Sequence, residues 1–419
     1  MPHLELGNLL GNGGPLPADL FERMGTTLEG LRHTLLGFSQ LETHPFAHMP
    51  PPPEGVQLIR SQARSLRREA EVLVVAGIGG SSLGASVLCC GPRSRVVFLE
   101  GVDPETLGAR LAAIPWDRAA LAVVSKSGGT LETLVNAALA LEALKKAAPD
   151  RWRSRVAAVA SPGDGALQRW CRDEGLPVLD IPPAVGGRYS VLSAVGLLPA
   201  AFDGVDPSAL VAGARAGMDR CLLLQGDQNP ALGLALALVQ LYAAGRTEVD
   251  LWGYGSRPYA FARWVQQLWG ESLGRRLDEH HRVGPSPVAC RGSEDQHSLL
   301  QLFVDGPPNR WVLLLTQDAP GPSLSAEARA FAGLPPRVFS VGTVQEALTH
   351  GTQRALHRAG VPAARYHLGA ADAASLGEAF YVFMAATLYA AALLEVDPFG
   401  QPGVEAGKRF TRDYLEGAE

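Results

Sequence analysis

Short apolar runs without polar interruption, separated by longer helical patterns, dominate the first half of the chain. Runs of this kind are typical of strands buried on both faces of a parallel sheet, with the intervening helices covering it. They therefore predict an α/β/α sandwich. The predicted strands are residues 72–76, 95–99, 120–124, 156–160 and 178–181.

The same pattern repeats in the second half, and a length of 419 residues suits two domains of ordinary size better than one core. We predict two tandem parallel-sheet α/β/α sandwiches with flanking helices and a boundary between Leu197 and Asn229. The second set of predicted strands is 248–253, 311–316, 338–341 and 365–368.

The two ends of the chain have their own patterns. The first 45 residues are helical and amphipathic, and the Pro/Gly-rich turn at 397–403 precedes a short final helix. The apolar run 379–394 falls short of the ~20 residues that cross a bilayer, so it predicts a buried helix and no membrane association. The predicted domains are 1–45 (N-terminal helical segment), 46–205, 206–395 and 396–419 (C-terminal turn and helix).

Composition narrows the classes of partner. A net charge of −5 gives no electrostatic reason to expect nucleic acid, and the N-terminus lacks the pattern of a secretory signal. Five cysteines without a C-x-x-C pair argue against disulfides and zinc, and fit a reducing cytoplasm. Only four lysines accompany 33 arginines, which raises the question whether an ammonium is specifically required at Lys126 and Lys408, both in Gly-containing loops.

A glycine-rich turn, Gly77 to Gly84, follows the first predicted strand and leads into a helix. Backbone N–H groups at such a turn suit an anion. A plain structural turn and a dinucleotide site remain alternatives at this point. The dinucleotide spacing requires glycine where Ser82 stands, although Glu100 lies where a ribose-binding acid would be expected.

A second polar turn, Ser125 to Thr133, follows the strand at 120–124. Its hydroxyls, an ammonium and backbone N–H groups can together satisfy the terminal oxygens of a phosphate monoester. A capped helix after a polar loop would explain one such turn equally well. Two turns at adjacent strand ends of one sheet favour a sugar-phosphate site, because ligands of open α/β sheets bind at the carboxyl ends of the strands.

Both turns, with four further segments in the same order, resemble phosphoglucose isomerases. The resemblance covers residues from about 70 to 410 and implies two sugar-isomerase-type domains, a sugar-phosphate substrate and no metal or organic cofactor. Two departures leave the chemistry untouched: Ser127 replaces the usual threonine, and Arg275 replaces lysine. The four further segments are 186–193, 267–275, 295–298 and 401–408.

The resemblance also implies roles in an aldose–ketose exchange between glucose 6-phosphate and fructose 6-phosphate, a reaction of glycolysis and gluconeogenesis. Glu271 would be the base that moves a proton between C2 and C1, and Arg188 would face the enediolate. Without the motif, Glu271 would be taken for a solvated residue near a helix end, and Arg188 could equally be a surface arginine in a Gly-Gly loop. The implied substrate-binding residues are Gly79, Gly80, Ser81, Ser125, Lys126, Ser127, Thr130, Gln267 and Gln401.

Ring opening is implied to use His297 and Lys408, one accepting the proton of the C1 hydroxyl and the other donating toward the ring oxygen. Histidine suits this because it titrates near neutral pH. In the family the equivalent of His297 comes from the neighbouring subunit, which implies a homodimer. A structural histidine and a solvated lysine are the plain alternatives.

Three other functions remain open from the sequence. A sugar-phosphate sensor would need the two turns but not Glu271, His297 and Lys408, and all three are present. A nicotinamide-dependent oxidoreductase depends on the imperfect glycine spacing. An isomerase that also accepts mannose 6-phosphate differs only in fine placement of the base, which the sequence does not determine.

Overall fold

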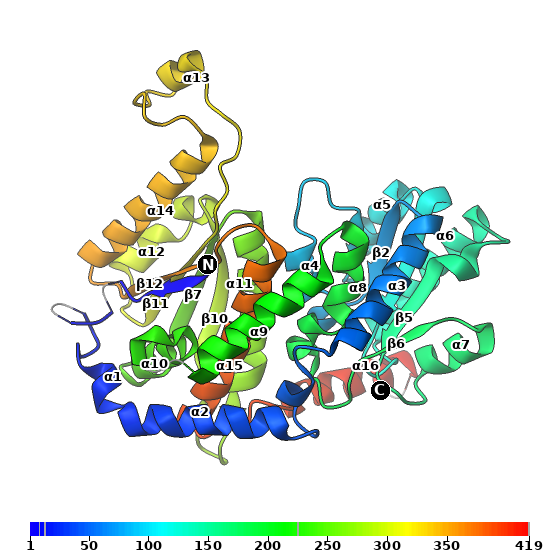
Figure 1. Cartoon of the computed structure of the whole chain (residues 1–419), viewed down its shortest axis with the longest axis horizontal. Coiled ribbons are helices and arrows are strands. Elements are labelled where there is room, and N and C mark those ends of the chain that lie inside the picture. The colour runs from blue at the N-terminus through cyan, green and yellow to red at the C-terminus, as the bar shows by residue number, and fades with distance from the viewer. Residues whose placement is uncertain (8, 12–13, 224–225, 418–419) are drawn as a thin grey trace.

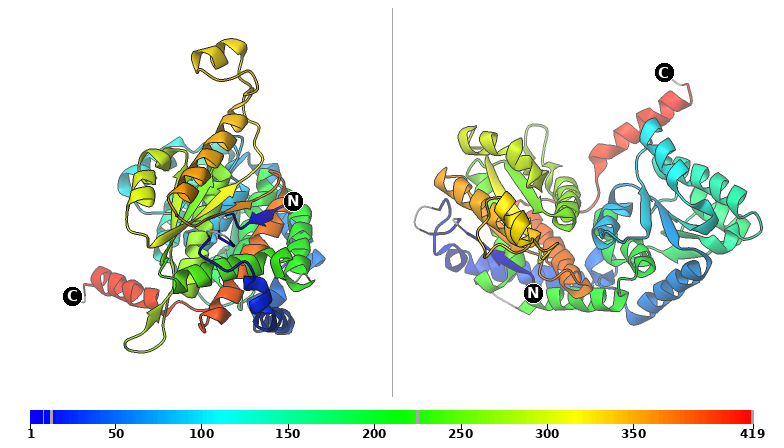
Figure 2. Two further views of the ribbon diagram at one scale, coloured as in Figure 1. Left: turned by 90° about the vertical axis from the view of Figure 1, so that its left-hand side faces the viewer. Right: turned by 90° about the horizontal axis from the view of Figure 1, so that it is seen from above.

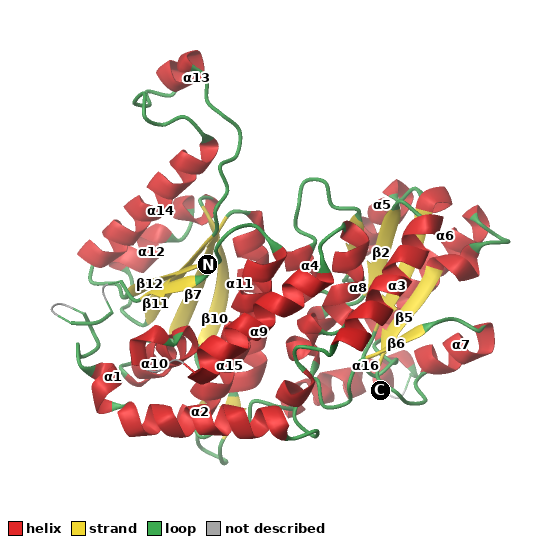
Figure 3. Ribbon diagram, in the orientation of Figure 1, coloured by secondary structure: helices red, strands yellow, loops and turns green. Residues whose placement is uncertain are grey.

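The computed structural model describes residues 1–7, 9–11, 14–223 and 226–417. Two lobes lie side by side, each built on its own five-stranded sheet with helices on both faces (Figures 1 and 3). The predicted α/β class with two parallel-sheet sandwiches is therefore confirmed. The domain limits drawn from the sequence remain a prediction.

The first sheet has the strand order β3-β2-β4-β5-β6, and all its pairings are parallel. The strands are β2 (Val72–Ala76), β3 (Val96–Leu99), β4 (Ala119–Val124), β5 (Val156–Ala160) and β6 (Val178–Asp180). All five strands predicted in this half are present. Because β2 pairs with β4, the two candidate phosphate turns leave the sheet at neighbouring positions of one edge.

The second sheet has the order β1-β12-β11-β7-β10, parallel except for β1, which pairs antiparallel with β12. Its strands are β1 (His3–Glu5), β7 (Glu248–Tyr254), β10 (Ser286–Gly292), β11 (Arg310–Thr316) and β12 (Ala363–His367). A short hairpin pairs β8 (Arg275–Arg276) with β9 (Arg282–Val283).

Three expectations for this half were wrong or incomplete. The predicted strand at 338–341 is instead the approach to helix α14 (Val341–Arg358), whose N-cap Ser340 accepts a hydrogen bond from the Thr343 N–H. Edge strand β10 was missed because most of its residues are exposed or half-buried, so it lacks an apolar run. Strand β1 lies within a segment predicted to be helical.

The remaining helices cover the sheets or connect the lobes. Those of the first half are α1 (Leu20–Arg23), α2 (Gly25–Gln40), α3 (Pro53–Glu69), α4 (Leu83–Leu88), α5 (Pro104–Ala113), α6 (Leu131–Ala147), α7 (Ala166–Glu174) and α8 (Ala194–Asp203). Those of the second half are α9 (Pro207–Leu223), α10 (Pro230–Ala243), α11 (Ser256–Leu273), α12 (Leu300–Asp305), α13 (Ala326–Phe331), α15 (Ala373–Leu393) and α16 (Glu405–Leu415).

Helix α15 is the apolar helix predicted from the run 379–394. By length and composition it could cross a membrane, but 89% of its most apolar window is buried inside the protein. It packs against α9, α10 and α11 and so lies at the centre of the second lobe. The prediction of a buried core helix is confirmed.

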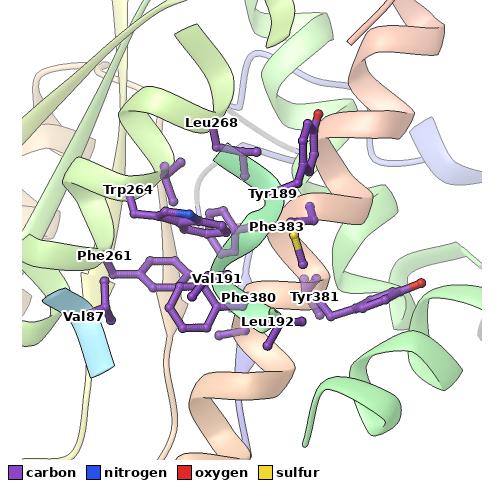
Figure 4. Packing of buried hydrophobic residues seen from close by; sticks show 14 of the residues in the cluster. Val87, Tyr189, Val191, Leu192, Phe261, Trp264, Leu268, Phe380, Tyr381 and Phe383 are labelled. Carbon is purple, nitrogen blue, oxygen red and sulfur yellow. The ribbon is translucent and has the colours of Figure 1, made fainter. Parts of the chain in front are cut away.

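One hydrophobic cluster joins the two lobes (Figure 4). Tyr189 and Val191, from the short 3-10 helix η5 (Gly187–Leu192), pack with Phe261 and Trp264 of α11 and with residues of α15. Helix α11 and η5 carry candidate catalytic residues from opposite lobes. Their shared core therefore holds these residues in a fixed relation.

Two segments project from the body of the molecule (Figures 1 and 2). An arm carrying α13 extends beyond the second lobe, and the Phe331 side chain at its end is 97% exposed. Helix α16 leaves the region between the lobes and has no buried residue. Its exposed Phe410 and Tyr414 lie on one side of the helix, four residues apart.

Candidate active site

The two phosphate turns are shaped by glycine and by hydroxyl contacts. In the first turn, Gly79 has a φ of +60°, a left-handed conformation that favours glycine. In the second, the hydroxyls of Ser125 and Thr130 lie 3.0 Å apart, directly before helix α6. Gly128 has a φ of +68°, and a Cβ there would meet the Gln168 Oε1 at 1.8 Å.

The backbone of the first turn also packs directly against the backbone of η5. A Cβ on Gly80 would lie 2.2 Å from the carbonyl carbon of Gly187, so only glycine allows this approach. The Ser190 hydroxyl donates to the Gly80 carbonyl at 3.2 Å and strengthens the contact. The turn after β2 and the segment that carries Arg188 therefore form one unit.

Arg188 is 3% exposed, and its guanidinium donates in five directions. Its Nε bonds the Ser272 hydroxyl at 2.7 Å. Its Nη1 bonds Glu271 Oε2 at 3.2 Å and Gln401 Oε1 at 2.8 Å. Its Nη2 bonds the Pro398 carbonyl at 2.6 Å and the Gly400 carbonyl at 2.8 Å. The buried cation is thus fully hydrogen-bonded, as its burial requires.

Glu271 lies in the last turn of α11, with about a quarter of its side chain exposed. One carboxylate oxygen accepts from Arg188, and the other accepts from Gln267 Nε2 at 3.1 Å, one turn earlier on the helix. Because the carboxylate is held from two sides, its lone pairs have a defined direction. This suits a base that must reach two neighbouring carbons.

Arg275 acts as a second guanidinium clamp behind Glu271. It donates to the Glu271 carbonyl at 2.6 Å and, from its Nε, to the Asp397 carbonyl at 2.8 Å. It also donates to the carbonyls of Phe399 and Gly400, at 3.4 and 3.0 Å. Burial, and then the nearby Arg188, lower the pKa of this guanidinium. Together the two arginines bind every carbonyl from 397 to 400 and fix the segment that leads to Gln401.

A cleft of about 570 Å³ brings these parts together. Its size is in the range of small-ligand sites. Ser125 lies behind the cleft wall, hydrogen-bonded to Thr130. The predicted site residues that line the cleft are Gly79, Gly80, Ser81, Lys126, Ser127, Thr130, Arg188, Gln267, Glu271, Gln401 and Lys408.

The two candidate lysines differ in how they are held. Lys126 is half-buried and donates from Nζ to the Pro183 carbonyl at 2.8 Å. Burial, and then the charge of Arg188, lower the pKa of this ammonium. Lys408 is 58% exposed on α16 and donates to Glu405 Oε1 at 2.7 Å, within its own helix.

His297 is the one predicted catalytic residue that does not reach the cleft in a single chain. It ends the 3-10 helix η7 (Glu294–His297), which follows β10, and its side chain is exposed. Among the described residues it has no hydrogen-bond or ion-pair partner.

Several lining residues were not singled out from the sequence. Ser161, Pro162 and Gly163 follow the carboxyl end of β5, and Gln168 and Pro183 close the wall beside Lys126. The strand-end rule could have found Ser161, because β5 was predicted and neighbours β4. Ser272, which bonds Arg188, lies inside the quoted motif beside Glu271.

The dinucleotide alternative loses support here. Ser82 is buried and donates its hydroxyl to Glu100 Oε1 at 2.6 Å, so this carboxylate braces the turn where a ribose-binding acid was considered. Among the described residues, no group of three or more His, Cys, Asp or Glu side chains is arranged to hold a metal ion.

The comparisons with known proteins agree with one another. A family model described as phosphoglucose isomerase matches residues 62–309. A glucose-6-phosphate isomerase of Rubrobacter xylanophilus is 35% identical over 427 aligned positions, covering 96% of this chain and 95% of that protein. A probable glucose-6-phosphate isomerase of Haloquadratum walsbyi is 36% identical, covering 82% and 79%.

Solved structures show the same fold. A hypothetical protein of Thermus thermophilus superposes with a TM-score of 0.88 at 31% identity, covering 99% of this chain and all of that one. A glucose-6-phosphate isomerase of Chlamydia trachomatis, at 19% identity, has a TM-score of 0.79 and covers 97% and 89%. Because the family model spans more than half of the chain and relatives above 30% identity cover most of it, the chain belongs to the phosphoglucose isomerase family.

Proposed function

We propose that the protein interconverts glucose 6-phosphate and fructose 6-phosphate through a cis-enediolate, in glycolysis and gluconeogenesis in the cytoplasm. The observation that carries the proposal is the shared cleft, which is lined both by the turn at 126–130 and by Glu271. A phosphate seated at the turn leaves the sugar carbons facing the carboxylate.

The phosphate is proposed to bind the hydroxyls of Ser127 and Thr130 and the N–H groups at the start of α6. A helix N-terminus favours an anion, and the hydroxyls supply further donors. Lys126 adds positive charge from the cleft wall. The Ser81 side of the first turn faces the same space and can bind sugar hydroxyls.

Proton transfer is assigned to Glu271. Its carboxylate removes the C2 proton of the open aldose, and negative charge then develops on the C1 oxygen as the enediolate forms. The Arg188 guanidinium beside it stabilises that charge without losing its own proton. Transfer of the C2 hydroxyl proton to the C1 oxygen, with return of the first proton from Glu271 to C1, then completes the ketose.

Two amides can position the sugar. The Gln401 Oε1 accepts from Arg188, which leaves its NH₂ group free to donate to a hydroxyl. The Gln267 NH₂ group bonds Glu271, while its Oε1 is buried without a hydrogen-bond partner among the described residues. Because that oxygen is closed off from the cleft, Gln267 positions the sugar by directing the Glu271 carboxylate.

The base assignment is tested with a coupled assay on fructose 6-phosphate. Glu271→Gln keeps the shape and removes the base, so we expect kcat to fall by about 10²–10⁴. The matched control is Glu142→Gln, an exposed carboxylate of α6, which should match the wild type. Activity retained by Glu271→Gln would remove the assignment.

Ring opening is proposed to use Lys408 and His297 of a second copy in a homodimer. His297 is exposed and lacks a partner among the described residues, and both the α13 arm and α16 present apolar side chains to solvent. A second chain would cover such surfaces and bring its histidine to the cleft.

Mixing inactive variants tests this arrangement. If His297 acts across the interface, a dimer of one Glu271→Gln chain and one His297→Asn chain contains one intact site. Random exchange of equal amounts should therefore restore about a quarter of wild-type activity. Absence of restoration in confirmed mixed dimers, or a fully active monomer in analytical ultracentrifugation, would contradict it.

A side activity on mannose 6-phosphate depends on fine placement at C2. This side activity is measured as the formation of fructose 6-phosphate from mannose 6-phosphate. Wild type and Glu271→Gln are assayed in parallel.

A further inference from the structure

A groove lined by arginines lies on the first lobe, away from the cleft. Helix α3 forms one wall and the connection between α8 and α9 forms the other, enclosing about 480 Å³. No residue that lines it also lines the cleft. We call this the arginine groove and define it by Arg60, Arg64, Arg67 and Arg68 with Gly204 and Asp206 opposite.

Helical spacing gathers the four guanidiniums. Positions i, i+4, i+7 and i+8 fall on one stripe of α3, beside the apolar face that packs on the lobe. The stripe runs about 12 Å along the helix, since each residue adds about 1.5 Å. A single small anion spans only part of that length.

Three of the four charges have no carboxylate partner. Arg60 lies 3.9 Å from Asp206 and donates to the Ser208 hydroxyl at 3.0 Å. Within the described parts of the chain, no ion pair involves Arg64, Arg67 or Arg68. Like charges on one stripe repel each other, so an unpaired cluster is unfavourable unless an anion joins it.

Nearby carboxylates are engaged elsewhere. Glu69, next to Arg68 in sequence, binds Arg151 at 2.6 Å. Asp203, at the end of α8, accepts from the Arg95 N–H at 2.7 Å. Other exposed arginines of this lobe, such as Arg118 and Arg153, do have carboxylate partners. Arg93, Arg95 and Arg110 of this lobe also lack a carboxylate partner among the described residues, so what sets the groove apart is the gathering of three such arginines on one helix stripe.

The opposite wall encloses the groove and adds positive electrostatic potential. Gly204 has a φ of +99°, which ends α8 and turns the chain away from Arg67. Helix α9 starts at Pro207, so its positive end lies at the groove, although the Asp206 carboxylate caps the Ser208 N–H at 3.0 Å.

We propose that the arginine groove is a binding site for a small polyanion with two or more linked phosphate groups. Guanidinium groups bind phosphate oxygens in pairs, and several of them along one stripe match a chain of phosphates. The groove lies beside the amino end of β2, whereas substrate meets the turn at its carboxyl end. Occupation of one site therefore leaves the other open.

Calorimetric titration of the full chain with inorganic tripolyphosphate tests the site, with fructose 6-phosphate saturating the cleft. The triple variant R64Q/R67Q/R68Q should raise the Kd at least about tenfold, since each lost guanidinium removes charge-assisted hydrogen bonds. The matched control is R118Q/R153Q/R169Q, which removes three exposed, paired arginines from the same lobe and leaves the Arg151–Glu69 ion pair intact. It should bind like the wild type.

Both triple variants should retain isomerase activity, because none of these residues lines the cleft. ATP and tripolyphosphate should bind with similar Kd, which would locate recognition in the phosphate chain, and added salt should weaken both. If the groove variant does not fold, R64Q and R67Q singly should each weaken binding. An unchanged Kd in the groove variants, displacement of tripolyphosphate by fructose 6-phosphate, or no binding by the wild type would each overturn the proposal.

Discussion

The two sides of the cleft differ in how their residues are held. Around Arg188, the Glu271 carboxylate, the amide of Gln401 and the backbone of 397–400 form one hydrogen-bonded network over a core shared by both lobes. On the other side, Lys408 lies on an exposed helix and, among the described residues, bonds only to Glu405 of that helix. His297 lies exposed outside the cleft. The residues proposed for proton transfer at C1 and C2 are thus held firmly within one chain, whereas the two proposed for ring opening are not.

The largest expected effect comes from the supported side. Arg188→Lys keeps a positive charge but supplies three donors in place of five, so it leaves buried carbonyls unbonded and moves the cation. We expect kcat to fall by about 10²–10³, the range for removing an anion-stabilising donor. Arg169→Lys, an exposed ion-paired arginine, is the control. Activity within a few-fold of wild type would show that the fork geometry is dispensable.

On the unsupported side, Lys408→Met should act on ring opening alone. We expect a loss of about 10–10² on fructose 6-phosphate, typical of one missing acid–base group. The 5-deoxy analogue of fructose 6-phosphate lacks the hydroxyl that closes the ring, so its turnover should change little. Lys146→Met, on the exposed end of α6, is the control. Equal losses on both substrates would place Lys408 in a different step.

Arg275 allows a smaller test of the supported side. Arg275→Met releases carbonyls at both Glu271 and the 397–400 segment, so kcat should fall by about tenfold through lost positioning. Arg275→Lys, which restores the residue usual in the family, should recover most of that loss. Arg276→Met, the exposed neighbour, should not change kcat. A loss confined to thermal stability, with kcat unchanged, would make Arg275 structural only.

The last test concerns stability against pH and is expected to leave catalysis at neutral pH unchanged. His44 stacks on Phe38 at 3.9 Å and meets the edge of Phe399 at 4.5 Å, supporting the 397–400 segment from behind. Burial lowers the pKa of His44 to about 4, against the opposing charge of Asp397. In the unfolded chain His44 has the ordinary histidine pKa of about 6.5. As the pH falls, the unfolded chain is therefore protonated at His44 before the folded chain is.

The free energy of unfolding should consequently decrease between about pH 6.5 and 4, by at most about 3 kcal/mol. Denaturant titrations of wild type and His44→Phe across this range measure the contribution, because phenylalanine keeps the stacking and does not titrate. Parallel pH profiles for the two proteins would contradict it.

Sequence reasoning was most successful where strands are fully buried. All strands of the first sheet were predicted, and the strand-end rule brought both phosphate turns to one edge. It failed at the margins of the second sheet, where β10 is half-exposed and β1 is only three residues long. A strand at 338–341 was predicted from apolar residues that instead lead into a capped helix.

For the site, the motif resemblance identified side chains but not the backbone that holds them. The carbonyls of 397–400 leave no pattern in a sequence, so the role of Arg275 as a clamp appears only in three dimensions. The proposed action of His297 requires a second chain, and a contact between two chains leaves no pattern in one sequence. The domain limits and the catalytic roles likewise stay predictions until tested.

The bare contact between Gly80 and Gly187 has a consequence for mutational tolerance. In a library of all single substitutions, selected for growth that requires the isomerase activity, position 80 should accept substitutions as rarely as Glu271. Glycine itself takes part in no chemistry. Even alanine would push one lobe's turn away from the backbone of η5. A position of this kind is intolerant of substitution because there is no space for a side chain. A map of intolerant positions would therefore include such packing sites as well as the reacting groups.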